Sequence, residues 1–334
     1  MEVIKLAHGS GGRLTHELIE NIIYEELGNN ILLKRDDASC LKPPAGKLAV
    51  TTDSFVISPI FFSGGDIGKL SVCGTVNDLA ANGAYPLYLT LSFILEEGLE
   101  IAKFKQIVSS IAKTAGRAGV KVVTGDTKVV KQGEADQIYI NTTGLGAIKQ
   151  GINLAEKTVQ PGDKVIVNGS LGDHGASILA DREGFDFKHN LKSDCSLLHD
   201  LIDQILAGSK GVKFLRDPTR GGLATTLNEI ANEEEVRIKV WEDALSFKPG
   251  VEALGEILGV DPLYLASEGR MVMIVDKKEV GQVVDIMVKE SEVETPKVIG
   301  EVTAEEEPGV DLVTELGGTK ELRMLNKELL PRIC

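Results

Sequence analysis

The sequence predicts an α+β protein of two domains. Its 334 residues are a typical length for two domains. In each half, segments with strand-like alternation of hydrophobic residues are interspersed with segments of helical periodicity. Between the halves, residues 149–163 turn polar and contain Pro161 and Gly162, which favour a turn. We therefore place one domain at residues 1–150 and a second at residues 151–322.

The first domain is expected to contain several strands of one sheet together with helices. Its β-rich segments predict strands at residues 47–57, 86–95, 120–130 and 137–148. Apolar residues at helical spacing predict helices at residues 14–27, 66–84 and 100–119. The last of these helices is amphipathic and ends at a glycine, which is a common helix stop.

In the second domain the same alternation starts again. Strands are predicted at residues 164–170, 236–243, 271–275 and 296–303. Helices are predicted at residues 171–184, 199–208, 217–234 and 276–290. The closing stretch, residues 318–334, is short and polar at first, and we interpret it as a mobile or conditionally docked tail. Residues 323–334 are assigned to this tail as a separate segment.

Charge and cysteine usage exclude several classes of protein. The net charge of -14 argues against a nucleic-acid partner, because no basic excess is available to release counterions. The N-terminal sequence lacks the features of a signal peptide, and no apolar run is long enough to span a bilayer. We therefore expect a soluble, cytoplasmic protein. Cys40, Cys73, Cys195 and Cys334 form no CxxC pair, so neither a zinc site nor a redox dithiol is indicated.

Three glycine-rich stretches predict contacts with a phosphate-rich ligand. They are HGSGGR at residues 8–13, GSLGDHG at residues 169–175 and DPTRGGLA at residues 217–224. Backbone amides at helix starts attract anions, and glycine lets a phosphate approach closely, although many glycines simply turn the chain. None of the three is a Walker A loop or a dinucleotide fingerprint. His8 and His174 lie in these loops without the paired spacing of a metal site, so each is expected to be a phosphate contact or a loop residue rather than a metal ligand.

Aspartates near the ends of predicted elements are candidate magnesium ligands. Magnesium usually binds through one or two carboxylates plus substrate phosphates. Asp36, Asp37 and Asp53 belong to this group, and loop aspartates also commonly cap turns. Asp78 is different, because it lies in a mostly small and apolar helix where a charge is costly unless it is paired or metal-bound.

Two further sets of charged residues are candidates for catalysis. Lys128 follows Asp126 at strand spacing, so that both side chains share one face. They are suited to bind metal and phosphate together, and a plain ion pair is the alternative. Glu268 comes just before a strongly apolar strand, and a carboxylate at the rim of a buried sheet is a candidate general base. Its alternative role is a salt bridge to Arg270.

Several motifs occur in the order found in one known superfamily. They are HGSGGR, RDDASC, TTDSFV, TVNDLAANGAYPLYLT, VVTGDTKVV, GSLGDHGASIL, DPTRGGLATTLNEIA and SEGRMV. In this order they resemble the aminoimidazole ribotide synthase-like (PurM-like) superfamily of ATP-dependent enzymes. Together with the closing PRIC, they resemble the HypE family of hydrogenase maturation factors. The resemblance covers nearly the whole chain, and PRIC is its most specific element.

The resemblance implies an architecture and a set of partners. It implies a PurM-like two-domain fold in which the N-terminal sheets of two subunits form a barrel in a homodimer, with a C-terminal α/β sandwich domain. ATP and magnesium are the implied ligands. In the family, the carbamoyltransferase HypF carbamoylates a terminal cysteine. ATP-driven dehydration then yields a thiocyanate, and the cyanide passes to iron held by the HypC–HypD complex for the nickel–iron centre.

The resemblance also implies roles for individual residues. Cys334 is expected to carry the carboxamide, and Glu268 is expected to be the base that removes the amide protons. Lys128 is expected to stabilise the phosphate or the amide oxygen. The expected metal ligands are Asp78, Asp126 and Asp53. The residues expected to bind nucleotide and phosphate are His8, Gly9, Gly11, Gly12, Asp37, Asp53, Asn77, Asp78, Asp126, Thr219, Arg220, Gly221 and Gly222.

Other members of the superfamily are alternatives. A thiamine monophosphate kinase or an aminoimidazole ribotide synthase would carry similar acidic motifs and leave Cys334 unused. A selenophosphate synthetase usually has a reactive cysteine or selenocysteine before its N-terminal glycine loop, and residues 1–12 contain none. A nucleotide-binding carrier without catalysis of its own is a further alternative. Only a cysteine carrier is expected to lose all function, with ATP binding intact, when Cys334 is removed.

Overall fold

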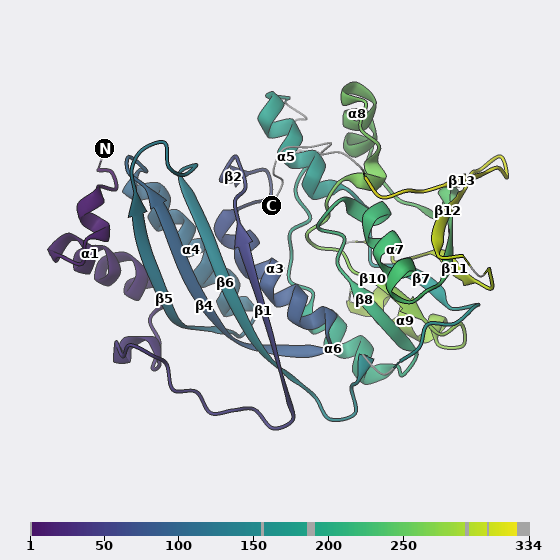
Figure 1. Ribbon diagram of the computed structural model, residues 1–334, viewed down its shortest axis with the longest axis horizontal. Helices are drawn as coiled ribbons and strands as arrows, with labels where there is room; N and C mark the ends of the chain where they lie inside the picture. Colours follow the sequence, from purple (N-terminus) through teal and green to yellow (C-terminus); the bar gives the residue numbers. More distant parts are fainter. Residues whose placement is uncertain (1, 155–156, 186–190, 291–293, 306, 326–334) are drawn as a thin grey trace. The chain divides into compact units, whose positions relative to one another are not determined.

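The computed structural model describes residues 2–154, 157–185, 191–290, 294–305 and 307–325. The chain forms two compact units, each with its own sheet and helices (Figure 1). The first unit contains the described residues up to Leu79 together with Ala84–Gln150. The second contains Ala80–Gly83 and the described residues from Gly151 onward. The α+β fold class predicted from the sequence is confirmed.

The first unit is built on a four-stranded sheet with the strand order β1-β6-β4-β5. Strands β1 and β4 both pair with β6 in antiparallel fashion, and β4 pairs with β5 in parallel through the crossover helix α4. Helices α3 and α4 lie on one face of this sheet (Figure 1). The elements are β1 (Lys47–Phe55), α3 (Ile67–Ala81), β4 (Ala84–Glu96), α4 (Ile101–Arg117), β5 (Lys121–Val130) and β6 (Ile138–Ile148).

Alternation along the strands decides which side chains face these helices. Phe93 of β4 points to the helical face, where its ring meets that of Phe104 edge-on at a centroid distance of 5.2 Å. Leu48 and Val50 of β1 and Ile94 of β4 point to the opposite face and are exposed. We call this opposite side the open face of the sheet.

The N-terminal segment forms helices that pack beside the sheet. The predicted helix at residues 14–27 is confirmed, and its central turns widen into a π-helix. A salt bridge of 3.2 Å from Lys105 of α4 to Glu25 joins this segment to the sheet's own helices. The elements of the first unit outside the main sheet are η1 (Leu6–Gly9), α1 (Arg13–Leu18), η2 (Ile19–Tyr24), α2 (Glu25–Leu27), η3 (Leu32–Lys34), β2 (Phe61–Phe62) and β3 (Gly65–Asp66).

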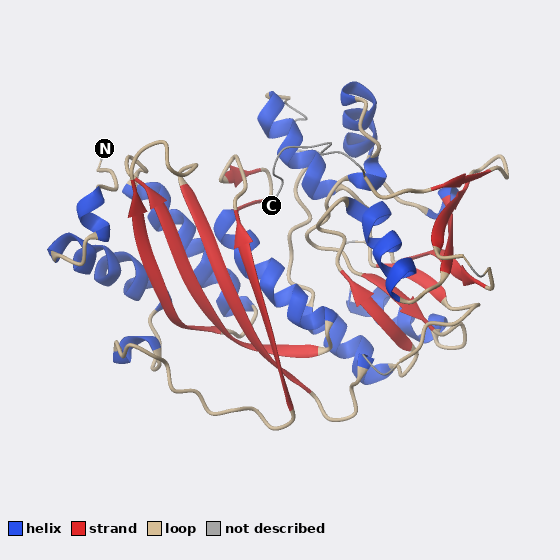
Figure 2. Cartoon of the chain, in the orientation of Figure 1, coloured by secondary structure: helices blue, strands red, loops and turns tan. Residues whose placement is uncertain are grey.

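The second unit is built on a seven-stranded sheet with the order β13-β12-β9-β11-β7-β10-β8 (Figure 2). All neighbouring pairs are antiparallel except β12 and β9. The strands are β7 (Lys164–Val167), β8 (Val212–Arg216), β9 (Arg237–Trp241), β10 (Val272–Val275), β11 (Lys297–Thr303), β12 (Gly309–Val313) and β13 (Thr319–Glu321). The helices are α5 (Asp173–Glu183), α6 (His199–Gly208), α7 (Gly222–Glu233), α8 (Pro249–Leu258) and α9 (Val280–Glu290), with short 3-10 turns at η5 (Glu242–Ala244) and η6 (Pro262–Tyr264).

Helices cover both faces of this sheet, which explains the continuous apolar sequence of its central strand. In β10, Val272 and Ile274 pack into a core that includes α7. The alternate residues Met273 and Val275 pack into a second core with α6 and α9. Because both faces are buried, no polar alternation is needed in this strand.

The stretch from residue 318, which was expected to be mobile or conditionally docked, is docked as far as the structure describes it. Residues Thr319–Glu321 form β13, which pairs with β12, and Leu322 is buried with its N–H donated to the carbonyl of Val310 at 2.8 Å. The tyrosine hydroxyl of Tyr264 donates to the carbonyl of Arg323 at 2.7 Å. Ladder pairing therefore fixes this stretch in spite of its polar sequence. The predicted tail, including Cys334, otherwise lies outside the described residues from 326 onward.

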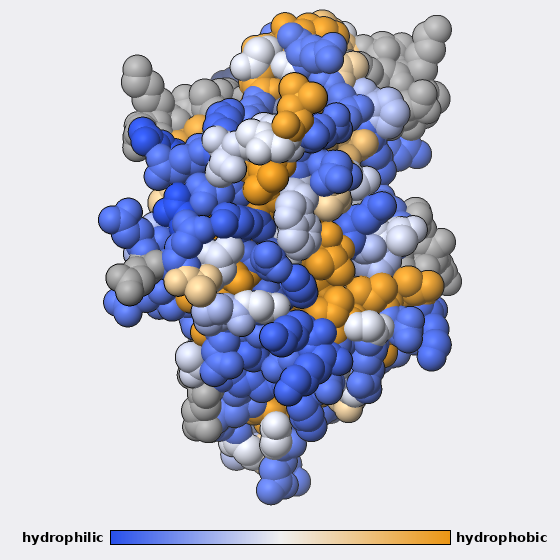
Figure 3. All heavy atoms as spheres, turned by 90° about the vertical axis from the view of Figure 1, so that its right-hand side faces the viewer, coloured by the Kyte–Doolittle hydropathy of each residue, from blue (hydrophilic) through white to orange (hydrophobic). Residues whose placement is uncertain are grey.

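On the face drawn in Figure 3, hydrophilic residues predominate and hydrophobic residues gather in small groups. Within the described ranges, we find no helix with the length and apolar character needed to cross a membrane.

Candidate functional site

A cavity of about 320 Å³ lies in the first unit between the N-terminal segment and the edge strand β5. One part of its wall is apolar and includes Ile23 and Phe93. Another part is polar, with Gly9, Asp126 and Lys128 among its lining residues. A cavity with apolar walls and a few polar groups is typical of a small-molecule site.

The glycine loop at residues 8–13 forms one rim of this cavity. The loop lies directly on β5, since a Cβ on Gly9 would come within 2.8 Å of the backbone nitrogen of Val129. His8 is buried, and its Nδ1 accepts the backbone N–H of Lys5 at 2.9 Å. His8 therefore stabilises the loop through its ring. Gly11 has a φ of 78°, which favours glycine, and no heavy atom lies within 4 Å of the position of a Cβ there.

Asp126 and Lys128 form an ion pair at the same cavity, with 2.8 Å between Nζ and Oδ2. The hydrogen bond from Lys128 lowers the pKa of Asp126, so this carboxylate is ionised at neutral pH. Both side chains are more than half exposed. The ion-pair alternative is thus confirmed for the chain without ligand, and both groups are also accessible to one.

Asp53 and Asp78 lie together on the helical face of the same sheet. The hydroxyl of Thr75 donates to Asp53 at 3.1 Å, and the hydroxyl of Thr51 donates to Asp78 at 3.1 Å. Asn77, the neighbour of Asp78 on α3, is buried. The free-energy cost of placing the Asp78 carboxylate in an apolar helix is therefore partly offset by the hydroxyl of Thr51 on strand β1.

Strand register separates the two sets of aspartates. Across the sheet, Asp53 of β1 pairs with Thr142 of β6, and Thr142 pairs with Leu91 of β4. Leu91 in turn pairs with Gly125 of β5, so Gly125 is the β5 residue in line with Asp53. Asp126 is the neighbour of Gly125, so its side chain points to the open face. The structure therefore does not bring Asp53 and Asp78 together with Asp126 in one chain.

No metal cluster results from these placements. Across the residues that the structure describes, no group of three or more His, Cys, Asp or Glu side chains is arranged to hold a metal ion. Asp36 and Asp37, the other candidate ligands of the first unit, are exposed in the loop after η3. Magnesium needs only one or two protein carboxylates when phosphate oxygens complete its shell.

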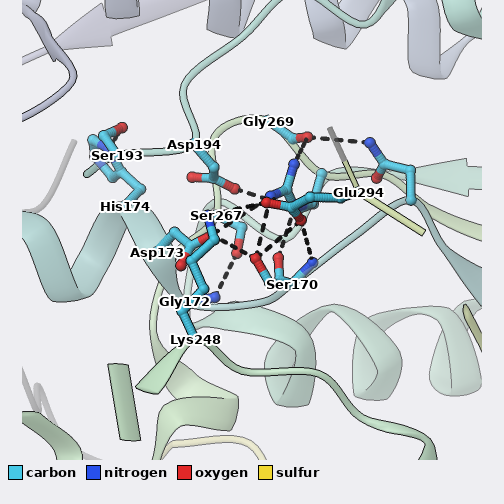
Figure 4. Close-up of polar contacts among 12 residues, drawn as sticks. Ser170, Gly172, Asp173, His174, Ser193, Asp194, Lys248, Ser267, Gly269 and Glu294 are labelled. Carbon is cyan, nitrogen blue, oxygen red and sulfur yellow. Dashed lines mark hydrogen bonds and ion pairs between the residues drawn. The ribbon is translucent and has the colours of Figure 1, made fainter. Parts of the chain in front are cut away.

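In the second unit, five charged side chains converge from the start of α5 and from the segments that precede α6, α8, β10 and β11 (Figure 4). We call them the buried charge cluster: Asp173, Asp194, Lys248, Arg270 and Glu294. Lys248 contacts Asp173 at 2.7 Å and Glu294 at 3.0 Å. Arg270 contacts Glu294 at 2.6 Å, Asp173 at 3.5 Å and Asp194 at 3.7 Å. A second cavity, of about 360 Å³, lies beside the cluster.

Burial dominates the proton affinities in this cluster. Asp173 and Asp194 are almost fully buried, and desolvation raises the pKa of each. Burial also acts to raise the pKa of Glu294, but Arg270 and the N–H of Ser170 outweigh it and lower that pKa. The cluster therefore holds three carboxylates and two cations, and the pKa is raised at the two aspartates and not at Glu294.

Glu268 lies on the segment that enters this cluster from β10. Its side chain is almost fully buried, and its backbone N–H donates to Oδ1 of Asp194 at 3.1 Å. The hydroxyl of the preceding Ser267 accepts the N–H of Gly172 from the second glycine loop at 2.8 Å. Glu268 thus occupies a buried position next to Asp194 and the second glycine loop.

The third glycine loop packs against the same segment. The carbonyl of Pro218 accepts the N–H of Ser267 at 3.0 Å. Gly221 and Gly222 have φ values of 66° and 62°, and a Cβ on Gly222 would come within 2.5 Å of the carbonyl oxygen of Leu263. Thr219 is partly exposed and Arg220 is exposed. Thr219 and Arg220 therefore lie just before α7 and directly follow Pro218, the residue that contacts Ser267.

Sequence reasoning missed four members of the buried charge cluster. They are Asp173, Asp194, Lys248 and Glu294. For Arg270 a salt bridge to Glu268 was given as an alternative, and its ion pairs with Asp173, Asp194 and Glu294 were not anticipated. His174, which the glycine loop suggested as a phosphate contact, is fully buried with its Nδ1 2.8 Å from the hydroxyl of Ser193. The only local signal for this cluster in the sequence was Asp173 within the second glycine loop.

Comparison with known proteins decides which family shares this arrangement. Residues 35–148 match the N-terminal domain and residues 160–313 the C-terminal domain of AIR synthase related proteins. The carbamoyl dehydratase HypE of Bradyrhizobium diazoefficiens is 44% identical over 332 residues, which cover 99% of this chain and 96% of that protein. The chain belongs to the HypE family.

Solved HypE structures share the fold over almost the whole chain. The hydrogenase maturation protein HypE in complex with ATP has a TM-score of 0.94 and 42% identity, with coverage of 98% of this chain and 99% of that one. HypE in a HypE–HypF complex has a TM-score of 0.80 and 40% identity, with coverage of 92% and 99%. The PurM-like two-domain fold expected from the HypE resemblance is confirmed.

Proposed function

We propose that this chain is an ATP-dependent carbamoyl dehydratase of hydrogenase maturation that converts an S-carboxamide on its own Cys334 into a thiocyanate. The observation that carries the proposal is its 44% identity to a carbamoyl dehydratase HypE over 99% of the chain. The closing PRIC sequence supports the assignment of Cys334 as the carrier. The thiocyanate would supply the cyanide ligand of the iron.

The chemistry explains why such an enzyme needs ATP. The oxygen of a carboxamide is a poor leaving group. Transfer of the γ-phosphoryl group of ATP to that oxygen releases ADP and creates a phosphate leaving group. Removal of the two N–H protons and cleavage of the C–O bond then give the nitrile and inorganic phosphate. The protein must hold the phosphates, offset their charge and supply a base.

The first unit is the proposed site for ATP. A related HypE has been solved in complex with ATP, and the cavity beside β5 has apolar walls suited to a base and a glycine loop suited to phosphates. Lys128 is proposed to stabilise the transferred phosphoryl group or the amide oxygen. In the second unit, Thr219, Arg220, Gly221 and Gly222 are proposed as further phosphate contacts.

Magnesium is the proposed counterion of these phosphates. Asp126 fits this role because it is ionised and exposed at the cavity. Asp53 and Asp78 lie on the other face of the sheet, so we assign them to a separate ion. Each set has at most two carboxylates, so phosphate or water oxygens must complete the coordination.

Glu268 is the proposed general base in the second unit. Its carboxylate is almost fully buried beside the glycine loops, where general bases gain from exclusion of water. It would take the N–H protons of the carboxamide as the phosphate leaves. Cys334 has no catalytic role of its own in this scheme and serves as the covalent carrier.

The proposal includes three partners. HypF is supported by the solved complex of a related HypE with HypF, and it would donate the carbamoyl group. The HypC–HypD complex would receive the cyanide. The third is a second copy of this chain. The exposed Leu48, Val50 and Ile94 on the open face support a homodimer in which two sheets close into a barrel.

Mass measurement of the carrier peptide tests the proposed reaction. The full chain is carbamoylated with HypF and incubated with Mg-ATP, and the peptide that contains Cys334 is weighed. Loss of one water, about 18 Da, from the adduct is expected because dehydration is the step that ATP drives. An adduct that ATP leaves unchanged contradicts the function. ATP turnover that does not depend on the carbamoylated tail would instead support a carrier without catalysis.

The variant Glu268→Gln tests the assignment of the base. The amide preserves the shape of the side chain and cannot accept the proton, so dehydration should slow by about 100-fold or more. ATP binding, measured by calorimetry, should be unchanged. Normal thiocyanate formation by this variant would show that another group is the base.

A further inference from the structure

The position of Glu268 depends on contacts made by its backbone. Residues Ser267–Arg270 precede β10 and belong to no helix or strand, so no ladder of hydrogen bonds fixes them. Their conformation must therefore come from the segments that pack on them. A base must be held within hydrogen-bond reach of the proton that it removes, and small displacements are costly.

The segment around Asp194 contacts these residues in two ways. Oδ1 of Asp194 accepts the N–H of Glu268 at 3.1 Å. A Cβ built on Gly269 would lie 1.9 Å from the backbone oxygen of Asp194, so the two backbones touch directly. The Asp194 side chain is 1% exposed, and nothing in the reaction proposed above uses it. One residue thus meets the Glu268 segment through both its side chain and its backbone.

We propose that Asp194 is a positioning residue for Glu268, which holds the base in place by accepting its backbone N–H. The inference rests on the proposed function, because it assumes that Glu268 is the base. Asp194 itself would touch neither the carboxamide nor ATP. Figure 4 shows its carboxylate beside the other residues of the buried charge cluster, and its Oδ2 lies 3.7 Å from Nε of Arg270.

The surroundings of Asp194 indicate that its hydrogen-bonding oxygen matters more than its charge. Its second oxygen, Oδ2, has no hydrogen-bond partner within the described residues and lies 3.7 Å from Nε of Arg270. Arg270 also has a shorter contact to Glu294. A neutral side chain with a carbonyl oxygen at the position of Oδ1 would preserve the contact to Glu268. Asparagine provides such a group in the same shape.

The test compares two substitutions of Asp194 in the full chain. Dehydration of the carbamoylated protein is followed in single turnovers with Mg-ATP, and the dissociation constant of ATP is measured separately. Asp194→Ala should slow dehydration by about 100-fold, as expected for a misplaced base, with the affinity for ATP unchanged. Asp194→Asn should restore the rate to within about threefold of the unsubstituted chain, because the acceptor is kept.

Two further variants make the result interpretable. Glu290→Ala is the matched control, because this carboxylate lines the same cavity as Asp194 and bonds only to Gln204 within the described chain, so its rate should be unchanged. Gly269→Ala tests the backbone contact if Asp194→Ala does not fold. Its Cβ would push the two segments apart, and the same selective loss of dehydration is expected.

The outcomes separate the inference from the function on which it rests. If Asp194→Ala reacts at the normal rate while Glu268→Gln does not, the positioning role is wrong and the base assignment stands. If Asp194→Asn is as slow as Asp194→Ala, the charge is required and the inference is overturned. If Glu268→Gln reacts normally, the base assignment itself fails, and the inference fails with it.

Discussion

Asp173 and Asp194 are carboxyl groups that the fold buries almost completely. Each retains one oxygen without a hydrogen bond inside the described chain, Oδ1 of Asp173 and Oδ2 of Asp194. Buried polar groups of this kind reduce stability and are kept where they serve another purpose. Both residues contact the surroundings of Glu268. Asp173 accepts a hydrogen bond from Ser170 and pairs with Arg270, and Asp194 accepts the backbone N–H of Glu268.

The raised pKa of Asp194 predicts a pH dependence of stability. Burial makes the folded state hold this proton more tightly than the unfolded state, whose carboxyl pKa is near the ordinary 3.8. The contribution of Asp194 to the free energy of unfolding is therefore fully present below pH 3.8. It declines as pH rises from there toward the raised folded pKa.

Asp194→Asn removes this dependence because the amide does not titrate. Relative to the unsubstituted chain, the variant should gain free energy of unfolding as pH rises from 4 to 7. Urea unfolding of both proteins at several pH values measures the difference. A difference that stays constant or shrinks over this range would show that Arg270 keeps Asp194 ionised in the folded state.

Sequence alone could identify the members of the site whose relation is local. Asp126 and Lys128 are two residues apart on a strand, so their shared face followed from strand geometry. The buried charge cluster was different, because Lys248 and Arg270 are 75 and 97 residues away from Asp173 in the sequence. Only the folded chain brings such residues together. The separation of Asp53 from Asp126 likewise required the register across three strand pairs.

At the scale of elements, the start of α7 shows why the third glycine loop has its sequence. Gly222 has a left-handed φ of 62° and lies against the carbonyl oxygens of Leu263 and Leu265. A side chain there would both strain the backbone and collide with the segment that leads to Glu268. The glycines of this loop therefore have a packing role that is independent of any phosphate.

The pair Gly222→Ala and Gly116→Ala separates packing from helix propensity. Gly222→Ala should lower the free energy of unfolding by about 3 kcal/mol, from left-handed strain and overpacking. Gly116 lies exposed in α4, with no atom within 4 Å of its Cβ position, so alanine there should stabilise by about 0.5–1 kcal/mol. Chemical unfolding measures both. Equal effects of the two substitutions would contradict the role of the close contact.

The long elements were predictable because their periodicity is strong. The predicted helices that correspond to α3 and α4 and the predicted strands β4, β5 and β6 are all confirmed. Strands β8, β12 and β13 and helix α8 were not predicted. Strand β13 has only three residues, all exposed, and its conformation comes from pairing with β12. Such a strand has no alternation of buried and exposed residues, so it cannot be predicted from its own sequence.

At the scale of the whole molecule, the open face of the first sheet carries exposed apolar residues. Leu48 and Val50 of β1 are 51% and 61% exposed, and Ile94 of β4, two strands away across β6, is 42% exposed. An antiparallel sheet commonly faces water on one side, but that side then carries polar residues. Exposed apolar residues in one area are typical of an interaction surface. A twofold pairing of this face with its own copy would bury them in both subunits.

Val50→Lys tests this homodimer against a matched control. A lysine at the centre of a face-to-face contact would place two like charges in an apolar interface, so the variant should sediment as a monomer at concentrations where the unsubstituted chain is a dimer. Ile257 of α8 is similarly exposed, at 59%, but belongs to the second unit and not to this sheet. Ile257→Lys should therefore remain dimeric in analytical ultracentrifugation. If Val50→Lys also remains dimeric, or if the unsubstituted chain is a monomer, the open face is not the contact between subunits. If Val50→Lys is monomeric and keeps its affinity for ATP, each cavity beside β5 binds nucleotide without help from a second copy.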